Sequence, residues 1–148
     1  MITAIIIRPA TAPEVIQVDA ERPWDTIGAE FPEFDTLKTG RRPVKLITDE
    51  DGLVKELLPN FMLNGQIVLG DGLIVQFDRD NRVEPTGEEL SAMIATASDL
   101  AAKRPSSADV ANWKRSAGVQ LFAGDEKISD EPIFDDLGRL RKGRAPER

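Results

Sequence analysis

The sequence predicts a small α+β domain: a mostly antiparallel sheet of hairpins packed against one long and one short helix, with a C-terminal helical extension. A length of 148 residues is close to the usual size of one domain. Short apolar segments separated by turn residues recur over the first half of the chain. A capping box at Thr86 then opens an amphipathic segment long enough for a helix. We expect residues 1–103 to form the α+β domain and residues 104–148 to form the extension, which ends in a basic tail at 139–148.

The first thirty residues predict a hairpin and a short helix. Residues 2–8 are continuous and β-branched, which is typical of a strand buried on both faces, and two prolines end this strand. Residues 14–18 mix polar and apolar side chains and predict the returning strand. Residues 22–31 place their apolar side chains at helical spacing behind Pro23, which predicts the short helix.

The next segment predicts a second hairpin. Residues 43–48 alternate between apolar and polar side chains, and residues 49–52 supply acidic and glycine residues suited to a turn. Residues 53–55 are then expected to return as the partner strand. Residues 57–60 contain a proline and an asparagine and are expected to break regular structure.

A third hairpin is predicted around Asp71 and Gly72. Apolar segments at 66–70 and 73–77 flank this pair, and Asp-Gly suits the positive φ angles of a tight hairpin turn. The local pattern therefore predicts that these two strands pair with each other.

The long helix is predicted over residues 87–103. Thr86 and Glu89 have the spacing of a capping box. Apolar side chains then recur at spacings of three and four, which predicts one face packed on the sheet. These side chains are Leu90, Met93, Ile94, Ala97, Leu100 and Ala101.

The extension is expected to begin with a linker at 104–107. Residues 109–116 predict a helix that carries Val110 and Trp113 inward, and residues 119–122 predict a strand. Ile133, Phe134, Leu137 and Leu140 form a further apolar stripe. These elements are too few for a core of their own, so we expect the extension to dock on the first domain or on a second copy, forming a homodimer.

The residue types that are absent exclude several chemistries. The chain contains no Cys, no His and no Tyr. It therefore cannot form a disulfide, a thiolate nucleophile or a Cys/His zinc site, and a hydrolytic triad would lack its usual base. Asp, Glu, Lys, Arg and Ser remain, and they could support Mg²⁺-assisted phosphoryl chemistry or a two-carboxylate mechanism.

Charge is distributed unevenly along the chain. Residues 1–138 carry a net charge of −11, whereas residues 139–148 carry +4. The acidic body repels nucleic acid, so direct nucleic-acid binding is not expected, and a basic tail is an ordinary feature of a solvated terminus. No apolar run approaches the roughly 20 residues needed to cross a bilayer, and no secretory signal is recognisable. These features predict a cytoplasmic protein without membrane contact.

Several stretches resemble a family of short domains of unknown function found in bacteriophages, plasmids and actinobacteria. The likeness covers about residues 1–100. It is carried by Arg8-Pro9 with Pro13-Glu14-Val15, by Asp49-Glu50-Asp51-Gly52-Leu53, by Leu57-Leu58-Pro59-Asn60, by residues 65–74 and by the helix opening at Thr86-Gly87-Glu88-Glu89. The resemblance implies an α+β fold and a mobile-element setting, and it implies no activity.

Two acidic clusters contain residue types that bind metal ions. Asp49, Glu50 and Asp51 offer the oxygen ligands that Mg²⁺ or Ca²⁺ prefers, but three consecutive acids in a turn point in different directions. Residues 78–83 begin like a calcium loop but have Val83 where that loop demands Gly. We interpret both segments as solvated turns and predict no metal and no cofactor.

The candidate ligand-binding residues are basic or amide side chains. Arg41, Arg42 and Lys45 form the basic cluster of the predicted domain, and they are either a forked anion site or a solvated loop. Arg8 is a further candidate cation. Asn60 lies at a rigid corner, where it binds a ligand or satisfies its own backbone.

The candidate interaction surface lies in the extension. It comprises Trp113, Phe134 and Leu137, which either contact a partner or cover one edge of the core.

Together these features predict a non-enzymatic accessory or interaction protein of a phage or mobile element. It would bind a host protein, as a counter-defence factor or a nucleic-acid mimic, or bind the surface of a second copy of itself. One alternative is a protein that sequesters a small ligand or nucleotide with Arg8, Arg41 or Arg42. A second alternative is a Mg²⁺-dependent enzyme that uses carboxylates from Asp49, Asp51, Asp78 and Asp80.

Overall fold

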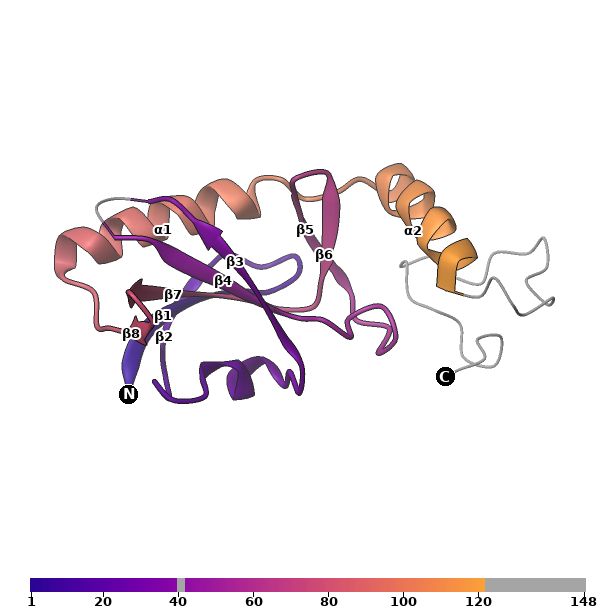
Figure 1. Cartoon of the computed structure of the whole chain (residues 1–148). Coiled ribbons are helices and arrows are strands. Elements are labelled where there is room, and N and C mark those ends of the chain that lie inside the picture. The colour runs from indigo at the N-terminus through magenta and orange to yellow at the C-terminus, as the bar shows by residue number, and fades with distance from the viewer. Residues whose placement is uncertain (40–41, 122–148) are drawn as a thin grey trace.

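The computed structural model describes residues 1–39 and 42–121 and confirms the α+β class (Figure 1). The strands are β1 (Ile2–Ile7), β2 (Glu14–Val18), β3 (Pro32–Leu37), β4 (Val44–Asp49), β5 (Pro59–Leu63), β6 (Gln66–Leu69), β7 (Gly72–Asp78) and β8 (Asn81–Arg82). The helices are the 3-10 helix η1 (Pro23–Ile27) and the α-helices α1 (Gly87–Ala101) and α2 (Ser107–Leu121). None of the helices in the described residues is both long and apolar enough to span a membrane.

The main sheet has the strand order β2-β1-β7-β4-β3, and every neighbouring pair is antiparallel. The short strand β8 also pairs with β7. β1 and β7 are buried along almost their whole length, as expected for continuous apolar segments in the interior of a sheet. The less apolar strands β2 and β3 lie at the two edges.

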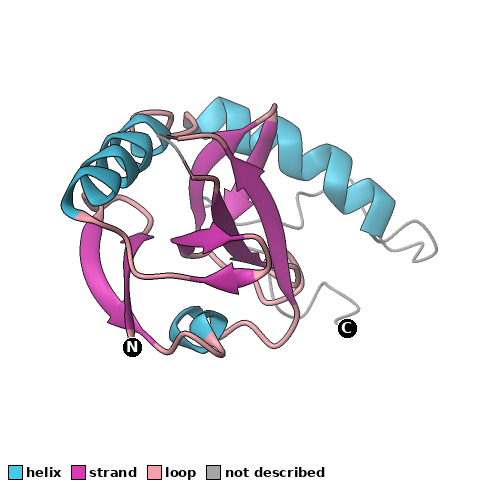
Figure 2. Ribbon diagram, turned by 60° about the vertical axis from the view of Figure 1, so that its left-hand side comes forward, coloured by secondary structure: helices cyan, strands magenta, loops and turns pink. Residues whose placement is uncertain are grey.

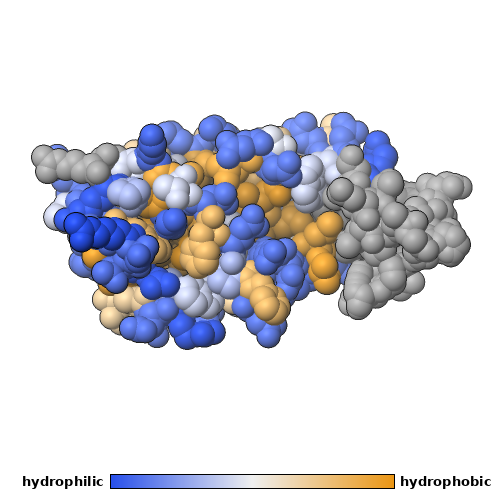
Figure 3. Space-filling model, in the orientation of Figure 1, coloured by the Kyte–Doolittle hydropathy of each residue, from blue (hydrophilic) through white to orange (hydrophobic). Residues whose placement is uncertain are grey.

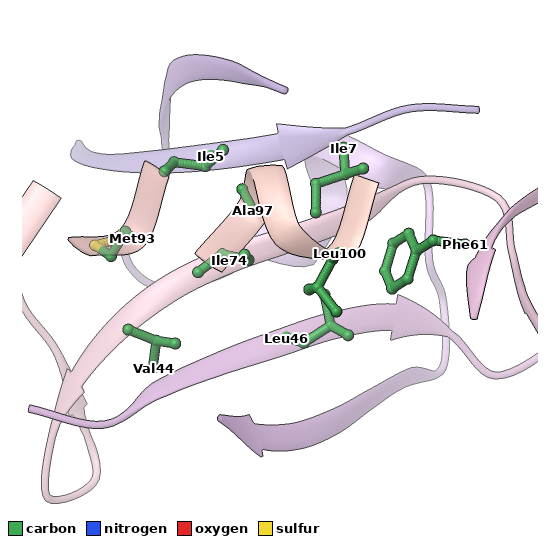
Figure 4. Close-up of a cluster of buried hydrophobic side chains, with 9 residues drawn as sticks. All are labelled: Ile5, Ile7, Val44, Leu46, Phe61, Ile74, Met93, Ala97 and Leu100. Atoms are coloured by element: carbon green, nitrogen blue, oxygen red, sulfur yellow. The ribbon is translucent and has the colours of Figure 1, made fainter. Parts of the chain in front are cut away.

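Both faces of this sheet are covered. α1 packs on one face, where Ile5, Leu46, Ile74 and Met93 belong to one buried apolar cluster (Figure 4). η1 lies on the opposite face of the sheet (Figure 2). Trp24 packs there against a second buried cluster. The alternation of side chains along each strand assigns neighbouring residues to these two cores.

The capping box predicted at the start of α1 is confirmed. The Thr86 hydroxyl accepts a hydrogen bond from the Glu89 amide, and the Glu89 carboxylate accepts one from the Thr86 amide. Met93, Ala97 and Leu100 are buried against the sheet, as the periodicity predicts, but Ile94 is exposed, so its predicted place on the packed face is wrong. The helix ends two residues earlier than predicted, at Ala101.

β5 and β6 form a hairpin of their own beside the end of α1 (Figure 1). Its turn is Asn64–Gly65, and both residues have positive φ angles, 50° and 79°. Phe61 of β5 is fully buried and joins the cluster under α1. The hairpin thereby extends the cover of that sheet face beyond α1.

Two predicted hairpins are wrong. The strands on either side of Asp71 and Gly72 do not pair with each other, because β6 pairs with β5 whereas β7 pairs with β1 and β4. Residues 53–55 form turns instead of a strand. The partners of β4 are β3, which the sequence did not predict, and β7. Residues 57–60 are partly regular, since β5 begins at Pro59.

The helix predictions also need correction. The predicted helix in residues 22–31 is a short 3-10 helix that ends at Gly28, where φ is 69°, and Phe31 is exposed. In the extension, α2 continues to Leu121, so the strand predicted at 119–122 is wrong over the residues that the structure describes. The apolar stripe at 133–140 lies outside the described residues.

Candidate functional site

The basic residues predicted to bind a ligand are not gathered at one place. Arg8 forms an ion pair with Glu14 at 2.7 Å, close to the start of β7. Arg42 contacts Glu89 at 3.3 Å and Asp78 at 3.7 Å, close to the end of β7. The charges of both arginines are therefore compensated within the protein.

Lys45 and Arg41 are the remaining basic candidates. Lys45 places its ammonium group 5.6 Å from the centre of the Phe77 ring, on the η1 face of the sheet. The guanidinium of Arg82 lies 5.6 Å from the same ring and 5.2 Å from that of Trp24. These contacts place two cations over the second apolar core, where their side chains cover aromatic surface. Arg41 lies outside the described residues.

Asn60 belongs to a buried network. It is 1% exposed, and its amide donates hydrogen bonds to the carbonyl oxygens of Ile7 at 2.7 Å and Gly70 at 2.8 Å. The Arg104 guanidinium donates to both oxygens of Asn60 and to the Thr11 carbonyl. Burial lowers the pKa of Arg104 from its usual value. The side chain of Asn60 thus joins strands β1 and β5 to the segment before α2.

Near this network, burial raises the pKa of the Asp71 carboxyl, and the positive charge of Arg8 opposes that change. The raised pKa follows from the position of Asp71 in the link between β6 and the buried strand β7.

The acids weighed as Mg²⁺ ligands lie apart. Asp49 ends β4 beside the start of β7, whereas Asp78 ends β7, because the two strands run antiparallel. Asp49 is buried and forms an ion pair with Lys55 at 2.6 Å. Within residues 1–39 and 42–121, no group of three or more carboxylates is arranged to hold a metal ion.

α2 packs on the β5–β6 hairpin. Val110 is 8% exposed and clusters with Ile67 and Leu69. Trp113 packs at the edge of this cluster, and its indole nitrogen lies 3.4 Å from the Gln66 side-chain oxygen. Phe134 and Leu137, the other residues of the predicted interaction surface, lie outside the described residues.

A cleft of about 420 Å³ lies between the β3–β4 edge of the main sheet and the β5–β6 hairpin. One wall carries the carboxylates of Glu33, Asp35 and Glu50. The other wall is mainly apolar, with contributions from Leu63, Val68 and Trp113. We call this the acidic cleft. The hydropathy surface in Figure 3 shows apolar side chains gathered between polar ones over the middle of the molecule.

The three carboxylates of the acidic cleft lack a basic partner in the part of the chain that the structure describes. The ion pairs there join other residues, and the buried Asp49, which also lines the cleft, forms an ion pair with Lys55. Glu33 and Glu50 are exposed and Asp35 is half-buried, so water solvates these charges. The cleft therefore presents uncompensated negative charge beside apolar surface.

β3 brings this charge to a free sheet edge. It pairs with β4 on one side, and no strand of the described residues pairs with its other side. Glu33 and Asp35 lie two residues apart and share one face, whereas Phe34 points to the other face. Phe34 is 42% exposed, and its ring meets the ring of Trp24 edge to face at 5.9 Å.

Glu33, Asp35 and Glu50 were missed as site residues in the sequence. The Glu-Phe-Asp alternation at 33–35 is a strand signal that could have placed the first two on one face. The apolar wall opposite has no such signal, because the β5–β6 hairpin lies across the cleft from β3 only in the folded chain.

Comparison of this chain with protein-family models, curated proteins and solved structures found no match. The resemblance to phage and plasmid domains therefore stays a prediction from the sequence.

Proposed function

We propose that this protein is a non-enzymatic interaction module that binds a basic segment of a partner protein in the acidic cleft. The observation that supports the proposal is the group of three carboxylates, Glu33, Asp35 and Glu50, without a basic partner in the described residues and facing an apolar wall. An occupant that satisfies both walls carries Lys or Arg together with apolar side chains.

The two walls have different roles in binding. Exposed carboxylates steer a basic partner and set its orientation more than they add affinity. Affinity comes from apolar burial, at roughly 1.5–3 kcal/mol for each large side chain that is fully buried. The wall with Leu63, Val68 and Trp113 supplies this surface.

The free edge of β3 supplies a third contribution. An extended segment can add a strand to an exposed sheet edge through main-chain hydrogen bonds, and alternate side chains then give specificity. At β3, one set of side chains would meet Glu33 and Asp35 and the other set would meet Phe34. The preferred segment is therefore extended, with basic and apolar residues in alternation.

The proposed partner is a basic protein of the host of a mobile element. An acidic body with a net charge of −11 over residues 1–138 is suited to a surface that otherwise binds nucleic acid. The phage-like resemblance suggests the host setting, and the acidic cleft suggests where the basic segment is held.

Peptide titration tests this function. A fluorescent extended peptide of alternating Arg and Leu should bind the full chain, and the Glu33→Gln/Asp35→Gln variant should bind it about tenfold more weakly, which corresponds to about 1.4 kcal/mol. Binding should also weaken as salt rises, because the carboxylates are partly exposed.

The matched control is Glu88→Gln/Asp99→Asn, which removes two exposed carboxylates from α1. Its affinity for the peptide should stay within about twofold of the parent, since neither residue lines the cleft and exposed charges are screened by salt. If both double variants lose the same affinity for the peptide, binding depends only on the net charge of the protein, and a defined site is contradicted.

A further inference from the structure

Acidic and aromatic side chains alternate along the free edge of β3. A segment of the same chain has the complementary alternation of basic and apolar side chains. Glu33 and Asp35 lie on one face of β3, and Phe34 lies on the other with 42% of its surface exposed. Residues 139–141 read Arg-Leu-Arg. In an extended strand both arginines would share one face and Leu140 would take the other.

We propose that Arg139, Leu140 and Arg141 add a strand to the free edge of β3 in the same molecule and so occupy the acidic cleft as an internal competitor. This inference rests on the proposed function, because it assigns the regulation of the same site. The two guanidinium groups pair with Glu33 and Asp35, and Leu140 covers Phe34.

The chemistry of the two segments is complementary on both faces. Arg forms forked, charge-assisted hydrogen bonds with carboxylates, and these are among the stronger polar contacts in proteins. Cross-strand pairs of opposite charge, and aromatic residues paired with aliphatic ones, stabilise the pairing of neighbouring strands. The central pair, Leu140 with Phe34, is the same whether the added strand runs parallel or antiparallel to β3.

The connecting chain is long enough. α2 ends at Leu121, and 17 residues separate it from Arg139. An extended chain covers up to roughly 3.3 Å per residue, which gives this connection a reach of about 55 Å. α2 already lies at the cleft, because Trp113 lines it, so the distance to be covered is much shorter than this limit.

Covalent connection favours the same molecule over a second copy. A tethered segment acts at an effective concentration near the millimolar range, whereas a second copy at micromolar concentration competes poorly. The net charges of −11 for residues 1–138 and +4 for residues 139–148 favour the same contact. The consequence is that a partner must displace the internal segment before it can bind.

Disulfide trapping in the full chain tests whether residues 139–141 dock on β3. The natural sequence has no cysteine, so two introduced cysteines can pair only with each other. Phe34→Cys/Leu140→Cys should form an intramolecular disulfide at least about tenfold faster than Val15→Cys/Leu140→Cys, because the tether raises the effective concentration at both sites whereas docking raises it further only at Phe34. Val15 is the matched control, since it is exposed and lies on the opposite edge strand β2.

Equal rates for the two cysteine pairs, or no disulfide in either, would overturn the proposal. Disulfide-linked dimers of the Phe34→Cys/Leu140→Cys variant would assign the contact to a second copy and would likewise overturn it.

Competition gives a second measurement that keeps Phe34 in place. In the full chain, Arg139→Glu/Arg141→Glu should bind the Arg–Leu peptide about tenfold more tightly than the parent, because the internal competitor is lost. Arg144→Glu/Arg148→Glu makes the same change of charge outside the docking segment and should leave the affinity near the parent value.

If the parent and the Arg139→Glu/Arg141→Glu variant bind the peptide equally, the internal competitor is refuted while the proposed function stands. If neither binds, the proposed function fails, and disulfide trapping decides the docking alone.

Discussion

Asn60 shows how one buried polar side chain connects segments that are distant in sequence. Its amide bonds to the carbonyl groups of Ile7 and Gly70, and Arg104 bonds to its oxygens. The sequence identified Asn60 as a polar residue at a rigid corner and left open a ligand or a local turn. Its observed partners include residues 53 and 44 positions away, so the local turn is wrong.

Replacing Asn60 by Ala should therefore destabilise the fold. The substitution removes two buried hydrogen bonds and leaves the Ile7 and Gly70 carbonyl groups without these donors. A buried polar group left unsatisfied costs about 1–3 kcal/mol, so we expect a loss of about 2–4 kcal/mol in the free energy of unfolding. Urea denaturation measures it.

Asn112→Ala is the matched control. Asn112 is exposed on α2, and alanine is the better helix former, so stability should stay the same or rise slightly. Equal stability of the Asn60→Ala variant and the parent protein would show that the network contributes little.

At the level of elements, the turn predicted at Asp71-Gly72 and the turn observed at Asn64-Gly65 show why the local pattern led to a wrong prediction. Asp71-Gly72 has a favourable turn composition, yet Gly72 belongs to β7, and β7 is buried on both faces between β1 and β4. A continuous apolar strand gains most from long apolar neighbours on both sides, which β6 alone does not provide. Asn64-Gly65 is the actual turn, and Asn-Gly is the pair that tight hairpins favour.

The backbone at Gly65 can be tested by adding one methyl group. A Cβ at Gly65 or at Gly87 would meet no atom within 4 Å, and the two sites differ because φ is +79° at Gly65. We expect Gly65→Ala to lose about 1–2 kcal/mol, since the left-handed region is unfavourable for residues with a side chain.

Gly87→Ala provides the comparison at the start of α1. Alanine reduces the conformational freedom of the unfolded chain there, so a gain of about 0.4–1 kcal/mol is expected. Thermal melting of both variants gives the difference, and equal changes of the same sign would contradict the role of the backbone angle.

At the level of the whole molecule, α2 is attached through the β5–β6 hairpin. Val110 packs on Ile67 and Leu69, and Arg104 bonds to Thr11 and Asn60 at the junction. Docking of the extension on the first domain was predicted because its apolar residues were too few for their own core. α2 packs on the β5–β6 hairpin of the same chain, whereas the apolar stripe at 133–140 lies outside the described residues, so docking of the whole extension stays a prediction.

Truncation before Arg104 should consequently lower stability. It removes Arg104, Val110 and Trp113 and exposes Ile67 and Leu69. Because burial of each large apolar side chain contributes roughly 1.5–3 kcal/mol, we expect residues 1–103 to lose several kcal/mol relative to the full chain.

Residues 1–121 are the matched control, since they retain α2 and its contacts. They should melt close to the full chain, and sedimentation of both forms shows whether a dimer is lost. Identical melting of residues 1–103 and 1–121 would contradict a stabilising role for α2.

The α+β class, the first hairpin, the buried strands and the capped helix α1 could all be predicted from the sequence alone. These features depend on contacts between residues close in the chain or on a period of apolar side chains, and both are visible in one dimension. Only the tertiary structure decided which strands are neighbours, that Asn60 is an internal connector and that Glu33 and Asp35 face the β5–β6 hairpin. Strand order depends on which buried faces complement each other across long separations, and a local pattern of turn residues carries no information about that choice.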